Sequence, residues 1–124
     1  MNTVKEELFL KLYRNRYIAF KIFSETNFSA DDIVHCVWRS LLNLFGEVGG
    51  SRTNFWLIDY SENGYGILRC THTSVEMMKS VLATVIDLKG FSLIIDVLGV
   101  SGTIKGVKRF FQEAVDSNRE INKS

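Results

Sequence analysis

FSLIIDVLGVSGTIKGVKRFF, residues 91–111, decides the fold, because it joins a strand pattern directly to a helix pattern. The apolar run from Phe91 to Leu98 is typical of a buried strand, and the spacing of apolar residues predicts a helix from Thr103 to about Asn118. Thr103 carries the hydroxyl that a helix N-cap needs. The side chains predicted to face the core from this helix are Ile104, Val107, Phe110, Phe111, Ala114 and Val115. The pattern predicts a last strand followed by an amphipathic last helix.

The connection between this strand and this helix has the composition of an anion site. Gly99 and Gly102 flank Ser101, and glycine allows a tight turn and a close backbone approach. The amides of the next helical turn carry the positive end of the helix dipole, which favours phosphate. Basic side chains follow on the first two turns, at Lys105, Lys108 and Arg109. An ordinary strand-to-helix connection with solvated lysines is the alternative.

The rest of the chain alternates between strand and helix patterns. The predicted elements are a short helix over 3–13, a strand over 17–24, a helix from Ser29 to the glycines at 46–50, a hairpin of strands over 53–60 and 65–71, and a helix from Thr73 to about Lys89. Ser29 with Asp32, and Thr73 with Glu76, have the spacing of capping boxes. The predicted inward side chains of these two helices are Ile33, Val34, Val37, Trp38, Leu41, Leu44, Phe45, Met77, Met78, Val81, Leu82, Val85 and Ile86.

This order of elements predicts an α+β fold. Strand, helix, strand, strand, helix, strand is the βαββαβ plan of a ferredoxin-like or RRM-like α-β sandwich with an antiparallel sheet. Both faces of the first and last strands are apolar, so we expect the extra N- and C-terminal helices to cover the second face. We expect one domain over residues 1–124, with its core over about 14–118.

Composition narrows the class of protein. Hydrophobic residues make up 46% of the chain and charged residues 23%, as in soluble globular proteins. No apolar run reaches the roughly 18 residues of a membrane span, and residues 1–7 lack the basic-then-apolar order of a signal peptide. Cys36 and Cys70 are too few for a disulfide scaffold or a four-ligand zinc site. We expect a cytoplasmic protein with two free thiols and no membrane contact.

Charge is distributed unevenly along the chain. The net charge of +1 and a pI near 7.8 are low for a protein that binds nucleic acid alone. Between residues 8 and 24, however, there are four basic residues and no acidic one: Lys11, Arg14, Arg16 and Lys21. Between residues 31 and 62 five acidic residues oppose only Arg39 and Arg52. Such a domain could present one surface to RNA and another to a protein, and ordinary charge scatter is the alternative.

The predicted strand over 65–71 only partly matches the RNA-reading strand of RRM domains. Gly64, Tyr65 and Gly66 fit, but Ile67 stands where an aromatic would stack on a base. We therefore expect no RRM-type reading of RNA on the sheet. Arg69 is predicted to pair across the sheet or reach its edge, where it could touch RNA.

No catalytic or metal-binding constellation stands out. His35 and His72 have no clustered ligand partners, and Asp59 and Asp96 lie on separate predicted strands, where they could meet. Acylphosphatases share this fold plan but need an arginine-bearing glycine loop after the first strand. Residues 25–28, ETNF, contain neither residue type.

Four short segments, in order and spread over about residues 14–110, resemble one family. They are RYI at 16–18, LFGEVG at 44–49, GILRC at 66–70 and GVSGTIK at 99–105. Together they resemble the archaeal ribonuclease P protein component 2 family, relatives of a eukaryotic ribonuclease P and MRP subunit. Each segment is short and three of the four contain glycine, so it is their order and spacing that make the match specific.

The resemblance implies a non-catalytic subunit of ribonuclease P, which binds and stabilises the catalytic RNA for 5′ maturation of precursor tRNA. In that family picture the RNA subunit and its Mg²⁺ ions hydrolyse the phosphodiester, so this chain binds no cofactor and contacts precursor tRNA only indirectly. The protein would neutralise RNA phosphates. The candidate RNA-binding residues are Arg14, Arg16, Lys21, Arg69, Ser101, Thr103, Lys105, Lys108 and Arg109.

The resemblance also implies a protein partner, the barrel-fold component 3, with which two copies of the chain can form a heterotetramer. Exposed apolar side chains would mark that contact, and Phe28, Trp56 and Phe91 are candidates because they lie at element edges. Two other functions share features with this chain. One is a small-molecule-binding regulatory module of the ACT type, which dimerises through its sheet, and the other is a general RNA chaperone.

Overall fold

In the computed structural model the backbone is described for residues 14–122 and the side chains for residues 14–117. The predicted helix over 3–13 lies outside the described residues. The elements are β1 Asn15–Ser24, α2 Ala30–Ser51, β2 Trp56–Tyr60, β3 Tyr65–Thr71, a 3₁₀ turn η1 His72–Ser74, α3 Val75–Thr84, β4 Asp87–Leu88, β5 Phe91–Ser101 and α4 Ile104–Asn122.

The five strands form one antiparallel sheet in the order β2-β3-β1-β5-β4. Strands β2, β3, β1 and β5 reproduce the strand order of the ferredoxin-like plan, which confirms the predicted fold class. β4 is an addition of two residues at one edge of the sheet. At the other edge, the register of β2 shifts between Leu57 and Asp59. The sheet therefore ends on one side in a very short strand and on the other in an irregular one.

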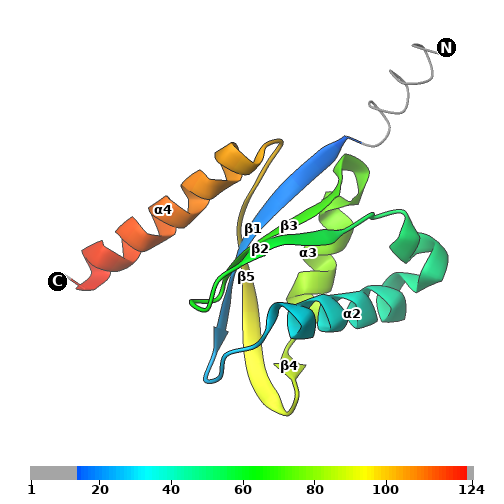
Figure 1. The fold of residues 1–124 in the computed structure, drawn as a ribbon, viewed down its shortest axis with the longest axis horizontal. Helices are drawn as coiled ribbons and strands as arrows, with labels where there is room; N and C mark the ends of the chain where they lie inside the picture. The colour runs from blue at the N-terminus through cyan, green and yellow to red at the C-terminus, as the bar shows by residue number, and fades with distance from the viewer. Residues whose placement is uncertain (1–13, 123–124) are drawn as a thin grey trace.

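Helices α2 and α3 cover one face of the sheet, as Figure 1 shows. Alternate residues of β1, Ile18, Phe20 and Ile22, point into this layer because successive side chains of a strand face opposite ways. They meet fully buried side chains of the two helices, among them Val37 and Met78. This layer holds the larger hydrophobic core of the molecule.

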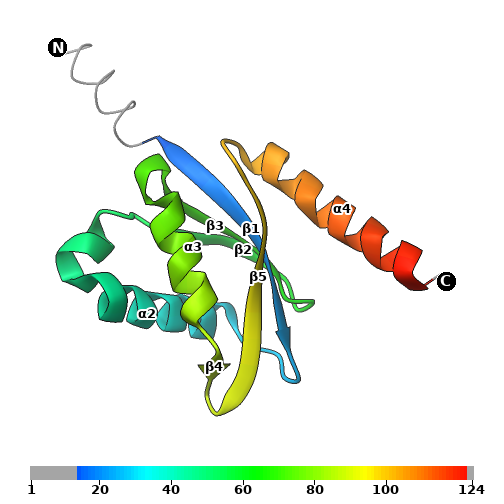
Figure 2. The ribbon, with the colours of Figure 1, turned by 180° about the vertical axis from the view of Figure 1, so that it is seen from behind.

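Helix α4 lies on the opposite face, as the view from behind in Figure 2 shows. Val107 is fully buried against Ala19 and Ile67, and Phe110 and Phe111 pack around them. The prediction that a C-terminal helix covers the second face is confirmed. The cover is partial, because Phe23 and Ile94, paired on the same face, remain 52% and 66% exposed.

Two local predictions are confirmed. The Ser29 hydroxyl accepts from the Asp32 amide at 3.1 Å, and the Asp32 carboxylate accepts from the Ser29 amide at 3.2 Å, which is the predicted capping box. The hairpin between β2 and β3 turns at Gly64, whose φ of 88° is the left-handed conformation that glycine adopts readily.

The first large helix differs from its prediction at its C-terminal end. Gly46 breaks the helix with a φ of 73°, but helical turns resume and α2 runs on to Ser51. Trp38, Leu44 and Phe45, predicted to face inward, are exposed. The stripe formed by Ile33, Val37 and Leu41 already meets the sheet, so the other apolar side chains of α2 lie outside it.

The second large helix is shorter than predicted, and its predicted Thr73–Glu76 capping box is absent. No side-chain hydrogen bond caps α3; instead the chain enters it through η1, where the Thr71 and Ser74 hydroxyls form a hydrogen bond of 2.7 Å. The helix ends at Thr84 rather than near Lys89, because Val85 is already extended and residues 87–88 pair with β5 as β4, before Lys89 and Gly90 turn with positive φ. Ile86 is consequently exposed rather than inward.

Candidate nucleic-acid interface

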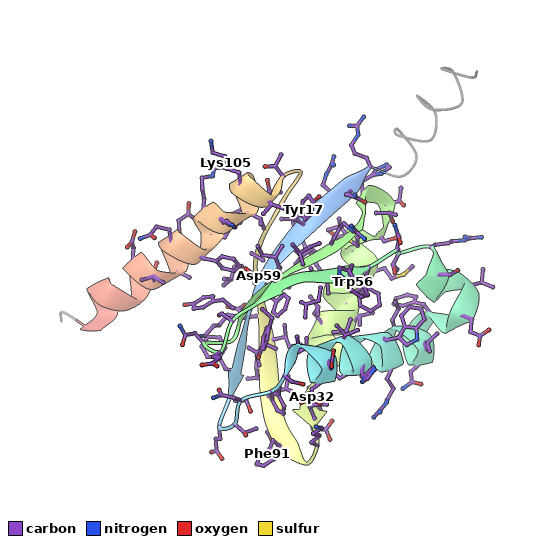
Figure 3. The ribbon with its side chains drawn as sticks, viewed as in Figure 1. Tyr17, Asp32, Trp56, Asp59, Phe91 and Lys105 are labelled. Atoms are coloured by element: carbon purple, nitrogen blue, oxygen red, sulfur yellow. The ribbon has the colours of Figure 1, made fainter. Side chains whose placement is uncertain are left out.

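The sheet register gathers the ends of three strands at one end of the molecule. Tyr17, near the start of β1, lies between Arg69 on β3 and Ser101 on β5. The chain turns after Ser101 into α4, so the start of that helix lies at the same end. Figure 3 shows Tyr17 and Lys105 there, with Asp32 and Phe91 at the opposite end. We call this region, with Arg14, Arg16, Arg52, Arg69 and Lys105, the basic end.

The turn into α4 is held by its own side chains. Thr103 Oγ1 accepts from the Gly106 amide at 2.9 Å, which confirms Thr103 as the N-cap. Ser101 Oγ accepts from the Thr103 amide at 3.4 Å. The hydroxyls of Ser101 and Thr103, both candidate RNA ligands, thus already organise the helix start and aim Lys105 outward.

The glycines of this connection do not act as predicted. β5 continues to Ser101, so Gly99 is a strand residue, and among the described residues only Gly46, Gly64 and Gly90 are glycines with positive φ. A Cβ on Gly99 would lie 2.5 Å from the Phe110 ring, whereas one on Gly102 would meet nothing closer than Arg16 Nη1 at 3.7 Å. Gly99 therefore lets α4 pack against the sheet and does not form a tight turn.

The cations of this region are accessible and lack acidic partners. Arg14, Lys105, Lys108 and Arg109 are exposed, and Arg16 is half-buried, donating from Nη1 to its neighbour's carbonyl at 3.0 Å. The salt bridges among the described side chains are Lys79–Glu76 and Lys89–Asp32, both elsewhere. Residues 105, 108 and 109 are three and four positions apart, so they share one side of α4. None of these five cations pairs with a carboxylate among the described side chains.

Lys21 belongs to a different environment. Its ammonium lies 4.1 Å from the centre of the Tyr65 ring and donates to the Asn63 carbonyl oxygen. Five residues along β1 separate it from Arg16, a distance of roughly 16 Å. The strand spacing therefore separates Lys21 from Arg16 and the start of β1.

Arg69 is half-buried on the α4 face, between Trp56 and Tyr17 in the register. Its Nε is buried and has no hydrogen-bond partner within the described residues. The predicted pairing of Arg69 across the sheet with an acidic group is absent from the described salt bridges.

One cation at the basic end, Arg52, was missed in the sequence. The Arg52 carbonyl accepts from Thr71 Oγ1 at 3.2 Å, and the His72 amide donates to the Arg14 carbonyl at 2.7 Å. Arg52 is exposed and adds a cation to this surface. The predicted hairpin carried the signal for Arg52. Because the start of β2 pairs with the end of β3, the residues just before β2 lie beside Thr71.

The groups considered for catalysis lie apart. Asp59 on β2 and Asp96 on β5 are exposed and separated by β3 and β1, so the expectation that they could meet is wrong. Burial raises the pKa of both Cys36 and Cys70 to about 11, which keeps these thiols protonated and unreactive. In the part of the chain that the structure describes, no three His, Cys, Asp or Glu side chains gather as a metal site.

The three apolar residues considered for a protein contact differ in exposure. Phe28 is only 7% exposed and belongs to the core, so it is no longer a candidate for the contact. Trp56 and Phe91 are 57% and 48% exposed and remain candidates for that contact. None of the described helices is both long and apolar enough to cross a membrane.

Comparison with known proteins assigns the family. Residues 16–112 match the Rpp14/Pop5 family. Ribonuclease P protein component 2 of Pyrococcus horikoshii is 43% identical over 99 residues, covering 79% of this chain and 82% of that protein. The protein of the same name from Methanosarcina mazei is 38% identical over 101 residues, covering 81% and 86%.

A solved structure agrees at the level of the fold. One chain of the cryo-EM structure of yeast ribonuclease MRP aligns with a TM-score of 0.61 and 12% identity, covering 90% of this chain and 95% of that chain. The family match and the archaeal relatives confirm what the four short segments indicated, and this chain belongs to the Rpp14/Pop5 family.

Proposed function

We propose that this chain is a protein subunit of ribonuclease P that holds the RNA subunit through its basic end during 5′ maturation of precursor tRNA. The observation that carries the proposal is the set of cations without acidic partners on the first turns of α4 and the start of β1. Their side chains are Arg14, Arg16, Lys105, Lys108 and Arg109. Family membership and the names of the archaeal relatives support it.

The proposed role is electrostatic. RNA strands repel each other when they fold closely, and lysine or arginine side chains beside phosphates reduce that repulsion. Each such contact releases condensed counterions, so binding weakens as salt rises. Because α4 is packed on the sheet and capped by Thr103, its cations are held in fixed positions relative to Arg14 and Arg16. The surface can therefore stabilise one RNA shape over others.

The chemistry of cleavage is assigned to the RNA subunit and its Mg²⁺ ions. The described side chains of this protein offer inert thiols, separated carboxylates and solvated cations, which suits a structural subunit. We propose that precursor tRNA is contacted indirectly and that the complex acts in the cytoplasm.

The proposed protein partner is component 3, in an assembly of up to two copies of each chain. Exposed apolar surfaces of suitable character lie on α2 and in the β4–β5 region. The exposed apolar residues of α2 and of the β4–β5 region include Trp38, Leu44, Phe45, Val48, Phe91 and Ile94. Their exposure is consistent with burial by a partner.

Reconstitution tests the proposal. Cleavage of precursor tRNA by an archaeal ribonuclease P RNA is measured at limiting Mg²⁺, with component 3 alone and with this chain added. A large gain in rate supports the subunit function. No gain from the folded chain would overturn it. Equally tight binding to unrelated RNAs would favour a general RNA chaperone, and amino-acid binding without RNA affinity would favour the regulatory module.

A double variant then tests the surface. Lys105→Ala with Arg109→Ala should lower cleavage at limiting Mg²⁺ about tenfold, because two phosphate contacts are lost. High Mg²⁺ should restore most of the rate, since added cations replace the missing charge. The control is Arg39→Ala with Lys79→Ala, which removes equal charge from α2 and α3. Equal rates for the two double variants at every Mg²⁺ concentration would exclude α4 from the RNA interface.

A further inference from the structure

One surface row at the basic end is left open by α4. The register places Trp56 opposite Arg69, Arg69 opposite Tyr17, and Tyr17 opposite Ser101, so one residue from each of four adjacent strands forms the row. Residues opposite each other in an antiparallel sheet point to the same face. Tyr17 packs with Ala19 and Ile67 in the α4 cluster, so the row lies on the α4 face.

Helix α4 buries the rows of side chains on this face of the sheet to different extents. The neighbouring row, with Ile67 and Ala19, is buried by Val107. In the open row, exposure rises toward the edge strand, from half-buried Tyr17 and Arg69 to Trp56, which is 57% exposed. Trp56 is labelled on the edge strand in Figure 3. A large aromatic ring is thus presented to solvent beside a guanidinium group.

Arg69 carries a second sign of an incomplete site. Its Nε is buried without a hydrogen-bond partner within the described residues. A buried unpaired donor is costly, and such groups call for a partner. No carboxylate lies on the row itself, and the cations Arg16 and Lys105 lie at the same end of the sheet.

We propose that Trp56 and Arg69 form a subsite for one unpaired nucleotide, whose base stacks on the Trp56 indole and whose polar edge accepts from Arg69. This inference rests on the proposed RNA-binding function and adds a specific nucleotide contact to it. The row spans three strand spacings, roughly 15 Å from Trp56 to Ser101. A single strand leaving the phosphate contacts near Lys105 can therefore cross the row and place a base at its far end.

A single-stranded partner is favoured over a duplex. Bases in a duplex are stacked on each other and cannot lie on an indole, whereas unpaired bases stack readily on aromatic side chains. Trp56 also stands on the edge strand, so a base can reach it from the open side of the sheet. This subsite is separate from the position of Ile67, where α4 excludes RNA.

The two tryptophans of the chain allow a direct test by fluorescence. In Trp38→Phe the remaining indole is Trp56, and in Trp56→Phe it is Trp38 on α2, which packs against Phe55 and is 39% exposed. Each full-length variant is titrated with a uridine oligomer of about 12 nucleotides and with a blunt RNA duplex of about 16 base pairs. Binding is followed separately by anisotropy of labelled RNA.

We expect the uridine oligomer to quench Trp56 emission and leave Trp38 emission unchanged, while the duplex binds without quenching either. Trp56→Ala should weaken oligomer binding about tenfold and duplex binding less than about twofold, and Trp38→Ala should change neither. Arg69→Gln should also weaken binding of the uridine oligomer. Arg69→Lys should retain only part of that binding.

The outcomes separate this inference from the proposed function. Saturable binding of the oligomer with unchanged Trp56 emission overturns the stacking subsite and leaves the RNA-binding function standing. Quenching of Trp56 by duplex and oligomer alike also overturns it. Binding of neither RNA overturns both. Unchanged Trp56 emission with RNA, but a blue shift on addition of component 3, would assign the indole to a protein contact instead.

Discussion

The two ends of the sheet use their cations in opposite ways. At the far end Lys89 pairs with Asp32 at 2.8 Å, and Lys21, partway along β1, lies over the Tyr65 ring. At the basic end Arg14 and Lys105 are exposed and meet no described carboxylate. A lysine with an internal partner contributes to the stability of the fold, while one without such a partner is available to a ligand. The difference shows that the position of a basic residue in the sequence does not identify its role.

The contrast between the two ends of the sheet is tested most directly by removing the cations of the basic end. The triple variant Arg14→Ala, Arg16→Ala, Lys105→Ala should weaken binding to ribonuclease P RNA by roughly tenfold to a hundredfold, because three phosphate contacts are lost. The slope of log affinity against log salt should fall by about 3. The matched control removes equal charge elsewhere, through Arg39→Ala, Lys79→Ala and Lys89→Ala. An equal loss in both triple variants would mean that net charge alone drives binding.

The basic end can also be disturbed without touching a charge. Gly99→Ala places a methyl group 2.5 Å from the Phe110 ring, so α4 must shift from the sheet. We expect a loss of about 1–3 kcal/mol in the free energy of unfolding, measured by urea denaturation, together with weaker RNA binding. Gly102→Ala is the control, since its nearest contact at 3.7 Å is ordinary packing. Equal destabilisation by both substitutions would refute the packing role of Gly99.

Lys21 provides the contrasting substitution. Lys21→Ala should lower the free energy of unfolding by about 1 kcal/mol, because the contact between its ammonium and the Tyr65 ring is lost. Its affinity for RNA should change less than about twofold, as Lys21 lies apart from the basic end. Thermal melts and RNA titrations of the same preparation check both. A large loss of RNA affinity with unchanged stability would return Lys21 to the interface.

The smallest expected effect is the pH dependence of stability that comes from Asp32, at the far end of the sheet. The hydrogen bond from Lys89, with that from the Ser29 amide, lowers the pKa of Asp32. Because this pKa is depressed in the folded state, its contribution to stability is present above about pH 4 and is lost as pH falls through the folded value. Asp32→Asn should therefore be less stable than the native chain at pH 7 and equally stable near pH 2. A difference that persists at the acidic limit would assign the effect to the cap geometry instead.

The fold could be predicted because its signals are local. The Ser29 capping box, the Gly64 turn and the two-residue alternation of β1 depend on neighbours in the sequence, and each is present in the structure. The end of α3 was missed, since Val85 and Ile86 continue a helical pattern. There, the β4–β5 pairing determines the local conformation.

The site could be predicted only in part. Lys105, Lys108 and Arg109 follow from the spacing of α4, and their exposure agrees with that spacing. Arg52 was missed, and Lys21 lies apart from Arg16 along β1, since the register across strands decides which cations meet. The role of Gly99 was also beyond the sequence, because it depends on a ring eleven residues later folding back onto the strand.

The edges of the sheet bear on how this chain exists before assembly. An exposed, regular edge strand recruits strands from other molecules and leads to aggregation. Here one edge is β4, two residues long, and the other is β2, whose register shift lies beside the exposed Asp59. Both strands are short or irregular, but β4 pairs only with Phe91 and Ser92, so the outer side of the rest of β5 is not covered by any described strand. That uncovered stretch of β5 is therefore the part of the sheet where a strand of another chain could add before or during assembly.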